Sequence, residues 1–293
     1  MDAHLRDLRY FTAVAEELSF TRAARRLHVS QPALSKQVAQ LESALRARLF
    51  DRSRRAIALS PAGSALLPHA RELLRMWDDA RRAVGEAEAA AQSTLTVGFQ
   101  TSIGRGLIPA VTRRLARDLP GWRLQFRQVP WTDPSAGLGA AGVDVAVAWL
   151  PVPPDAELSW RVVTVEERWV ALPPGHRLAR RRRVPFAALA GEAFVALPES
   201  AGPLRDFWLA AEQRTAPARI AVIAETADET FEAVASGHGV ALLAAGNVEI
   251  YQRDDVVFRP VDGLSPSRLA VVWRTGDERD AVRVFTEACC RCL

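Results

Sequence analysis

The sequence predicts an α/β protein made of an N-terminal helix–turn–helix with a hairpin wing, a long linker helix and a C-terminal α/β domain. Three observations predict this. A helix–turn–helix pattern and a basic hairpin span residues 19–60, a heptad repeat covers residues 61–92, and strands alternate with helices from residue 93 onward. A chain of 293 residues with 49% hydrophobic content can bury more than one core. We therefore expect domains at residues 1–60, 61–92 and 93–293.

The first element is a pair of short helices joined by a tight break. Ser19 is a suitable N-cap for a helix over residues 20–27, and Ser30 can cap a second helix after the break. Pro32 lies in the first turn of that second helix, where its missing N–H does no harm. Apolar residues recur at steps of four, three and four along it, which predicts one buried stripe. The stripe is Leu34, Val38, Leu41 and Leu45.

The opposite face of the second helix is polar. At about 100° per residue, Pro32, Ala33, Lys36 and Gln40 face away from the stripe. Gln31, Ser35 and Gln37 flank this face. Such a face offers donors, acceptors and one small apolar contact, which are the groups that read base edges in the major groove of DNA. The alternative is an ordinary helical hairpin with a solvated polar face.

A basic hairpin follows and favours the DNA-binding interpretation. The run Phe50-Asp51-Arg52-Ser53-Arg54-Arg55 leads into Ala56-Ile57-Ala58-Leu59, which predicts a tight hairpin with arginines at its tip. Residues 1–60 contain eleven Lys and Arg against six Asp and Glu, a net charge of +5, whereas the whole chain carries +4. The remaining residues therefore sum to −1. A basic head on a nearly neutral body is typical of a nucleic-acid-binding domain.

Residues 61–92 predict one long helix, with Ser60 as its cap and Pro61 at its first position. Apolar residues repeat along it at alternating steps of four and three, which is a heptad seam for pairing with another helix. We expect dimerisation through this seam; the alternative is that it packs on the chain's own body. The seam consists of Leu66, Ala70, Leu73, Trp77, Ala80, Val84, Ala87 and Ala91, with Leu66, Leu73, Trp77 and Val84 as its large members.

The rest of the chain predicts alternating strands and helices with largely parallel sheets. The expected strands are residues 94–99, 123–129, 143–148, 169–172, 194–197, 220–225, 240–244 and 269–273. The expected helices are residues 107–117, 204–211, 228–236 and 280–290.

The run from Phe11 to Gly63 resembles the winged helix–turn–helix of LysR-type transcriptional regulators. It matches the spacing AxxLxxSQPALSxQVxxLExxLxxxLFxRxxRxxxLSxAG without a gap. Two positions depart from the family, because Arg46 stands where a glycine is usual and Ser60 replaces a threonine. The resemblance implies that the second helix enters the major groove and that the hairpin holds the DNA backbone or the adjacent minor groove. The implied DNA-binding residues are Ser30, Gln31, Pro32, Ala33, Ser35, Lys36, Gln40, Arg52, Arg54 and Arg55.

The resemblance continues in the C-terminal domain through AGVDVAVAWLP at residues 141–151 and EAVASGHGVALLA at residues 232–244. It implies a fold similar to type 2 periplasmic binding proteins, with subdomain I at about residues 93–163 plus 267–293 and subdomain II at about 164–266. A small-molecule effector would bind between them. The resemblance also implies a homodimer that assembles into a homotetramer on double-stranded promoter DNA, where it controls access of RNA polymerase.

Strand ends predict where the effector binds, because ligands of open α/β sheets lie beyond the carboxyl ends of strands. Hydroxyl groups follow three predicted strands, and helix capping is an equally good explanation for each loop taken alone. Trp131 and Trp149 add aromatic surface, which favours a planar or apolar effector, although Trp149 is as well explained as a core or hinge residue. The predicted effector-binding residues are Thr101, Ser102, Trp131, Trp149, Ser200 and Thr226.

Other functions fit the sequence less well. No nucleophile elbow, Walker loop, dinucleotide fingerprint or metal-ligand spacing is present, so we expect neither an enzyme nor a bound metal or cofactor. Cys289, Cys290 and Cys292 crowd the C-terminus and predict reduced thiols. A solute-binding protein would need an export signal, which is absent, so we expect the chain in the cytoplasm. An effector-independent architectural or constitutive DNA-binding repressor is the alternative function.

Overall fold

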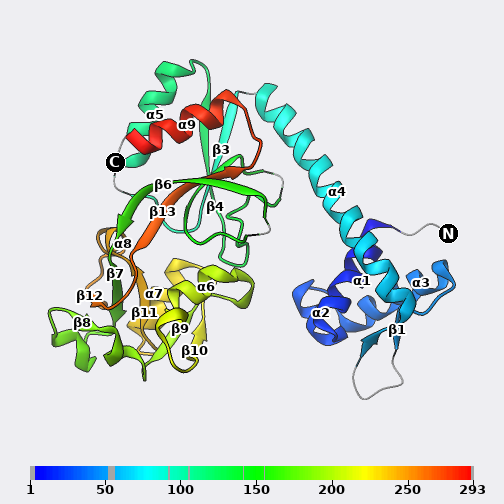
Figure 1. Cartoon of the computed structure of the whole chain (residues 1–293), viewed down its shortest axis with the longest axis horizontal. Helices are drawn as coiled ribbons and strands as arrows, with labels where there is room; N and C mark the ends of the chain where they lie inside the picture. The colour runs from blue at the N-terminus through cyan, green and yellow to red at the C-terminus, as the bar shows by residue number, and fades with distance from the viewer. Residues whose placement is uncertain are drawn as a thin grey trace. The chain divides into compact units, whose positions relative to one another are not determined.

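The computed structural model describes residues 4–51, 57–91, 93–104, 106–140, 142–154 and 156–291 (Figure 1). The chain forms two compact units, Met1–Val84 and Gly85–Leu293. The first unit is helical with a small hairpin, and the second contains the larger sheets. The long helix α4 (Pro61–Ala91) begins in the first unit and ends in the second.

The first unit contains α1 (Leu5–Glu17), α2 (Phe20–Arg26) and α3 (Gln31–Leu45), followed by the antiparallel pair β1 (Phe50–Asp51) and β2 (Ala58–Leu59). Both predicted N-caps form, since the Ser19 hydroxyl accepts the Arg22 N–H and the Ser30 hydroxyl accepts the Ala33 N–H. Phe50 contacts Phe11 in a tilted and Phe20 in an edge-on arrangement, at ring-centroid distances of 5.5 and 5.7 Å, and closes the core.

The predicted buried stripe of α3 is correct for three of its four residues. Leu34, Val38 and Leu41 are fully buried, whereas Leu45 is 43% exposed. The reason is local, because α3 ends at Leu45 and Arg46 follows as its C-cap in the left-handed conformation, with φ of 51°. A residue without a side chain adopts this conformation most easily, which explains why a glycine suits this position and why Arg46 is a departure.

The linker helix α4 has two parts with different surroundings. Its first turns pack on the head, where Ala70 is buried and Leu66 is partly buried against the same core as Phe11. Further along, Leu73, Trp77 and Val84 are 48%, 45% and 67% exposed. The heptad seam therefore packs on the chain's own N-terminal helices at its start, and its large residues Leu73, Trp77 and Val84 are exposed.

The first sheet of the second unit has the strand order β4-β3-β5-β13-β6. Its strands are β3 (Thr94–Phe99), β4 (Arg123–Gln128), β5 (Val145–Trp149), β6 (Leu158–Glu166) and β13 (Ser267–Arg274). Strands β3, β4 and β5 run parallel, while β13 runs antiparallel to β5 and β6. Helices α5 (Leu107–Asp118) and α9 (Asp280–Arg291) lie side by side on this part of the chain (Figure 1). We call this sheet and its helices subdomain I.

Subdomain II contains a four-stranded sheet of order β11-β7-β12-β8 and a parallel pair β10-β9. The strands are β7 (Arg168–Leu172), β8 (Val184–Pro185), β9 (Ala193–Ala196), β10 (Arg219–Ile223), β11 (Ala241–Ala244) and β12 (Val257–Asp262). The helices are α6 (Pro203–Trp208), α7 (Ala227–Ala235) and α8 (Ala245–Ile250). Short 3₁₀ turns occur at η1 (Arg177–Arg180), η2 (Phe186–Leu189), η3 (Glu199–Ala201) and η4 (Ala211–Gln213).

Each strand expected from the sequence has a counterpart, but the expectation of largely parallel sheets is wrong. Both larger sheets of the second unit are mixed, because β13 pairs antiparallel in subdomain I and β7 pairs antiparallel with β11 and β12 in subdomain II. Strands β6, β8 and β12 were not expected. Strand β6 has no clean alternation of buried and exposed residues, so its pattern resembles a loop.

Two glycines of α4 give a matched test of this packing. A methyl group at Gly63 would overlap the Leu49 carbonyl oxygen, whereas nothing lies within 4 Å of the corresponding position at Gly85. We expect Gly63→Ala to lower the free energy of unfolding by about 1–3 kcal/mol through overpacking. We expect Gly85→Ala to raise it by up to about 1 kcal/mol, because alanine favours a helix over glycine. Urea denaturation followed by circular dichroism measures both, and a neutral Gly63→Ala would contradict the packing of α4 on the head.

Candidate functional site

The exposed face of α3 is the first candidate site. Gln31, Pro32, Ala33, Lys36 and Gln40 are exposed on it. Ser30 is exposed just before it, and Ser35 is half-buried and accepts a hydrogen bond from the Gln31 amide nitrogen at 2.9 Å. The structure thus brings the predicted base-reading residues onto one surface. The predicted residues Arg52, Arg54 and Arg55 lie outside the described residues.

A contact of a half-buried carboxylate, which the sequence did not reveal, fixes the orientation of α3. Glu42 accepts the backbone N–H groups of Leu49 at 2.7 Å and Phe50 at 3.3 Å. These bonds join the last turn of α3 to the start of the hairpin. Together with the buried Leu34, Val38 and Leu41, they hold the helix with its polar face outward.

The arginines of α2 have a different environment from Lys36. Arg22 and Arg26 form ion pairs with Glu17 and Glu16, at 3.3 and 2.8 Å. Within the described part of the chain, Lys36 forms no ion pair or side-chain hydrogen bond. Its ammonium group is therefore available for a phosphate or a base, while Arg22 and Arg26 mainly connect α1 and α2.

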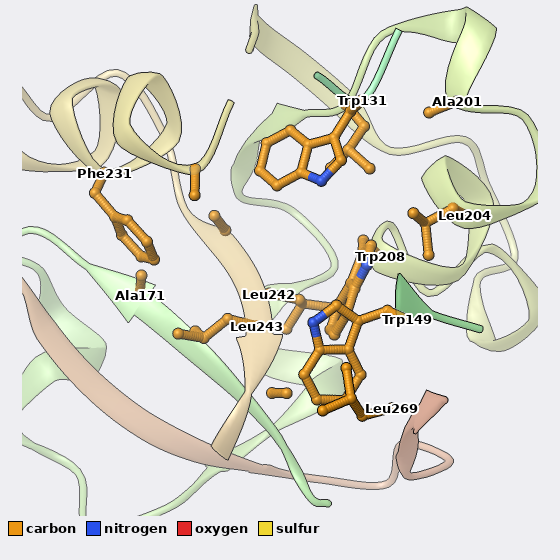
Figure 2. Packing of buried hydrophobic residues seen from close by; sticks show 14 of the residues in the cluster. Trp131, Trp149, Ala171, Ala201, Leu204, Trp208, Phe231, Leu242, Leu243 and Leu269 are labelled. Atoms are coloured by element: carbon orange, nitrogen blue, oxygen red, sulfur yellow. The ribbon is translucent and has the colours of Figure 1, made fainter. Parts of the chain in front are cut away.

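The second candidate site is a cavity of about 40 Å³ between the two subdomains. Three tryptophans form much of its wall, with Trp131 and Trp149 coming from subdomain I and Trp208 from subdomain II (Figure 2). The rest of the lining comes from subdomain II. It consists of Val195, Ala196, Leu197, Leu209, Ala227, Thr230, Phe231, Ala241, Leu242, Leu243, Asn247 and Tyr251, and Thr101 completes it from subdomain I.

Three of the six predicted effector-binding residues line this cavity, namely Thr101, Trp131 and Trp149. The side chains of Ser102, Ser200 and Thr226 are not part of its lining. Ser102 and Ser200 are exposed. Thr226 caps α7, where its hydroxyl accepts the Glu229 N–H at 3.3 Å, so helix capping accounts for it.

Sequence reasoning missed the aromatic residues of subdomain II. Trp208, Phe231 and Tyr251 come from α6, α7 and the end of α8, and none of them directly follows a strand. A rule based on strand ends could not find them. The available signal was their aromatic character within short helices.

Trp149 is at once a core residue and part of the cavity wall. It is 3% exposed, its indole N–H donates to the Thr101 hydroxyl at 3.1 Å, and its ring meets Trp208 edge-on at 5.9 Å. Its strand neighbour across β13 is Leu269, which lies beside it in Figure 2. The position of Trp149 is thus consistent with both interpretations from the sequence, an effector-binding residue and a core residue.

Hydrogen bonds close the two subdomains on each other around the cavity. The Ser102 backbone N–H donates to the Tyr251 hydroxyl, and the Trp131 backbone N–H donates to the Glu225 carbonyl, both at 2.9 Å. Each bond joins a segment of subdomain I to one of subdomain II. Both bonds involve segments next to lining residues of the cavity, so they fix the two subdomains relative to each other beside it.

Comparisons with known proteins identify the chain. Residues 5–64 match the bacterial regulatory helix-turn-helix protein model of the lysR family, and residues 88–291 match the LysR substrate binding domain. The chain belongs to the LysR family.

Curated relatives of this LysR-family chain match along nearly the whole length. It is 34% identical over 285 residues to the HTH-type transcriptional regulator ShiR of Corynebacterium glutamicum (strain R), covering 94% of this chain and 95% of the relative. It is 33% identical over 287 residues to the Hca operon transcriptional activator HcaR of Escherichia coli (strain K12), covering 96% and 95%.

Solved structures are also similar to this chain over nearly its whole length. Full-length CbnR complexed with its target DNA is 25% identical, with a TM-score of 0.53 and coverage of 99% of both chains. A full-length OxyR variant of Pseudomonas aeruginosa is 26% identical, with a TM-score of 0.54 and coverage of 98% and 100%.

These findings confirm the function predicted from the sequence. The LysR-type chain is a transcriptional regulator with an N-terminal DNA-binding helix–turn–helix and a C-terminal effector-binding domain. It belongs to a family of regulators and not of enzymes. Among the described helices, none is long and apolar enough to cross a membrane. The described residues also contain no group of three or more His, Cys, Asp or Glu that could hold a metal ion.

In this LysR-type regulator a buried arginine connects the start of β7, which follows the crossing strand β6, to the cavity wall. Arg168 begins β7, just after the crossing strand β6, and its guanidinium donates to the Ser265 carbonyl, the Ser265 hydroxyl and the Phe207 carbonyl at 2.8, 3.0 and 2.7 Å. The same group stacks on the Phe207 ring, with 4.3 Å to its centroid. Burial lowers the pKa of Arg168 to about 10. The next residue after Phe207 is Trp208 of the cavity wall, so Arg168 fixes α6 relative to both crossing segments.

Proposed function

We propose that this regulator binds promoter DNA as a homotetramer, and that an effector held between its C-terminal subdomains changes the access of RNA polymerase to the promoter. One observation carries the proposal. The same chain presents a rigidly held polar helix face on α3 and a cavity whose wall is shared by two subdomains. Because its target is chromosomal promoter DNA, we place the protein in the cytoplasm.

Base reading falls to the polar face of α3. Gln31 and Gln40 carry amides that can pair with adenine edges, and Ser35 can bond to either base type. Pro32 and Ala33 are exposed and apolar, which suits contact with a thymine methyl group. Lys36 adds a positive charge beside them. The sequence resemblance assigns Ser30 to the same surface and Arg52, Arg54 and Arg55 to the DNA backbone.

The switch needs an effector that distinguishes two arrangements of the subdomains. A ligand can shift an equilibrium only by its difference in affinity for the two states. A ligand between subdomains I and II meets that condition, because the residues that surround it belong to both subdomains and change position when the subdomains move. We propose that this movement alters the spacing of the DNA-binding domains in the tetramer and bends the intervening DNA differently.

The first test concerns the reading face. We expect Gln31→Ala to reduce the preference for the operator over random DNA by about tenfold or more, since one bidentate base contact is worth about 1–3 kcal/mol. We expect Lys36→Ala to weaken binding to both DNAs and to reduce the salt slope by about one. Fluorescence anisotropy with both duplexes at several salt concentrations measures this. Ser43→Ala, on the exposed far end of α3, is the control.

Equal losses on operator and random DNA after Gln31→Ala would remove this residue from the reading role. An unchanged operator preference together with unchanged affinity in both variants would show that α3 does not contact DNA.

The second test concerns assembly. The exposed apolar residues Leu73, Trp77 and Val84 lie along one seam of α4, and Met76 beside them is also exposed. A protein with one reading head per chain needs a partner to read two half-sites. We expect Trp77→Glu to shift the protein toward smaller species in sedimentation velocity, because it places a charge in the seam. Arg75→Glu puts the same side chain away from the seam and should leave the assembly intact. A tetramer that survives Trp77→Glu would exclude pairing through this part of α4.

A further inference from the structure

Tyr251 belongs both to the cavity wall and to the junction between the subdomains. It follows α8 in subdomain II, and its side chain is one of those that line the cavity. Its hydroxyl oxygen accepts the backbone N–H of Ser102 at 2.9 Å, and Ser102 comes from subdomain I. One side chain therefore borders the space between the subdomains and also makes a contact that joins them.

The tyrosine ring is held in place within subdomain II. It contacts the Phe231 ring with 4.7 Å between the ring centroids, and Phe231 in turn meets Phe258 edge-on at 5.8 Å. Phe231 comes from α7 and is buried, so the tyrosine ring packs on the core of this subdomain. Aromatic pairs prefer particular geometries, and this packing therefore restricts the direction in which the Tyr251 hydroxyl points.

The loop that carries Ser102 lies close to the end of α8 at the same place. Gly104 has a φ of 57°, and a methyl group built on it would overlap the Ile250 side chain. Ile250 directly precedes Tyr251 in the chain. The absence of a side chain at Gly104 lets the loop adopt this conformation and approach α8. The hydrogen bond from Ser102 to Tyr251 thus forms beside a closely packed contact between the two subdomains.

A second hydrogen bond crosses the junction at a different point. The Trp131 backbone N–H donates to the Glu225 carbonyl at 2.9 Å. Trp131 lies beyond the end of β4, which pairs parallel with β3, the strand before Ser102. The buried Gln100 amide ties the two loops together, because it donates to the Asp133 carbonyl at 3.0 Å. On the side of subdomain I, the two contacts are therefore parts of one connected edge.

Subdomain II connects the partners of these two bonds in a similar manner. Glu225 lies shortly before α7, and Tyr251 lies directly after α8. Phe231 of α7 contacts the Tyr251 ring, and residues of both helices line the same cavity. Each side of the junction is thus internally connected. We therefore expect the loss of one bond across the junction to weaken the other.

We propose that Tyr251 is a latch of the switch. Its hydroxyl holds the two subdomains in this arrangement, and its ring places the latch in contact with any effector that occupies the cavity. The inference rests on the proposed function, because the latch regulates the protein only if the arrangement of the subdomains does. It gives Tyr251 a positioning role at the junction in addition to its place in the cavity wall.

The connection between the subdomains explains why one hydrogen bond matters here. The chain passes between them at one end of the β6–β13 ladder, so noncovalent contacts hold the rest of the junction. One net hydrogen bond changes an equilibrium constant by about two- to tenfold. A bias of this size is useful in a switch, because a ligand shifts such an equilibrium only by its difference in affinity for the two states.

Tyr251→Phe tests the latch, because phenylalanine keeps the ring and removes only the acceptor of the Ser102 N–H. Hydrogen–deuterium exchange of the whole chain, resolved to single residues by fragmentation mass spectrometry, reports how often each protected amide opens. We expect the amides of Ser102 and Trp131 to exchange about two- to tenfold faster than in the unsubstituted protein. The amides of β5, inside the sheet of subdomain I, should exchange at an unchanged rate.

The Trp131 amide decides the outcome, since the substitution does not touch its own hydrogen bond. An unchanged rate at Trp131 would show that Tyr251 makes a local contact only, and would overturn the proposal. Equal acceleration in β5 would also overturn it, because it would mean a general loss of stability. Thr275→Val is the control, as it removes an exposed hydroxyl that pairs with Ser159 outside the cavity lining. Faster exchange at Trp131 in this control would likewise count against the latch.

The measurement needs neither DNA nor a ligand, so the latch and the proposed function can fail separately. Faster exchange at Trp131, in a protein that binds operator and random DNA equally, would support the latch and refute the proposed function. An unchanged rate at Trp131, in a protein that prefers its operator, would overturn the latch and leave the proposed function in place.

Discussion

The crossing of the chain between subdomains is the constraint on which the C-terminal domain depends. Strands β6 and β13 pair antiparallel along their whole length, from Ser267 opposite Glu166 to Arg274 opposite Leu158. The chain leaves this pair for subdomain II after β6 and returns from it before β13. Both connections are therefore at one end of one ladder, and the Ser267 hydroxyl bonds the Glu166 carbonyl there at 3.0 Å. The two subdomains are therefore covalently joined at a single place, the shared end of this ladder.

A buried arginine at that end of the ladder connects the crossing segments to helix α6 in the cavity wall. Burial of a guanidinium costs free energy, and Arg168 offsets this cost with three carbonyl and hydroxyl acceptors, a ring contact and the nearby negative charge of Glu212. The acceptors come from the segment before β13 and from α6. The head uses the same device more simply, since Glu42 ties α3 to the hairpin through two backbone N–H groups. In both units a single charged side chain orients the functional surface.

Periodicity predicted the N-terminal unit well, because the exposed polar face and the buried apolar stripe lie on opposite sides of one helix, α3. Gln31, Lys36 and Gln40 are exposed for the same reason that Leu34 and Val38 are buried. The strand-end rule likewise placed Thr101 at the cavity, and aromatic character pointed to Trp131 and Trp149. The aromatic residues of subdomain II could not be found in this way, because the cavity forms only when α6, α7 and α8 meet a second subdomain that is distant in sequence. Strand β6 was missed because its half-exposed pattern has no regular period.

The central claim is that an effector in the tryptophan-lined cavity changes the arrangement of the two subdomains. The most direct measurement is the distance between spectroscopic labels introduced bio-orthogonally at Arg113 on α5 and Arg182 in subdomain II, both exposed, by pulsed electron resonance. We expect a changed distance at saturation with an effector that alters operator affinity, and no change in Ala227→Leu, whose larger side chain fills the cavity. Full occupancy of the cavity with an unchanged distance distribution would contradict it.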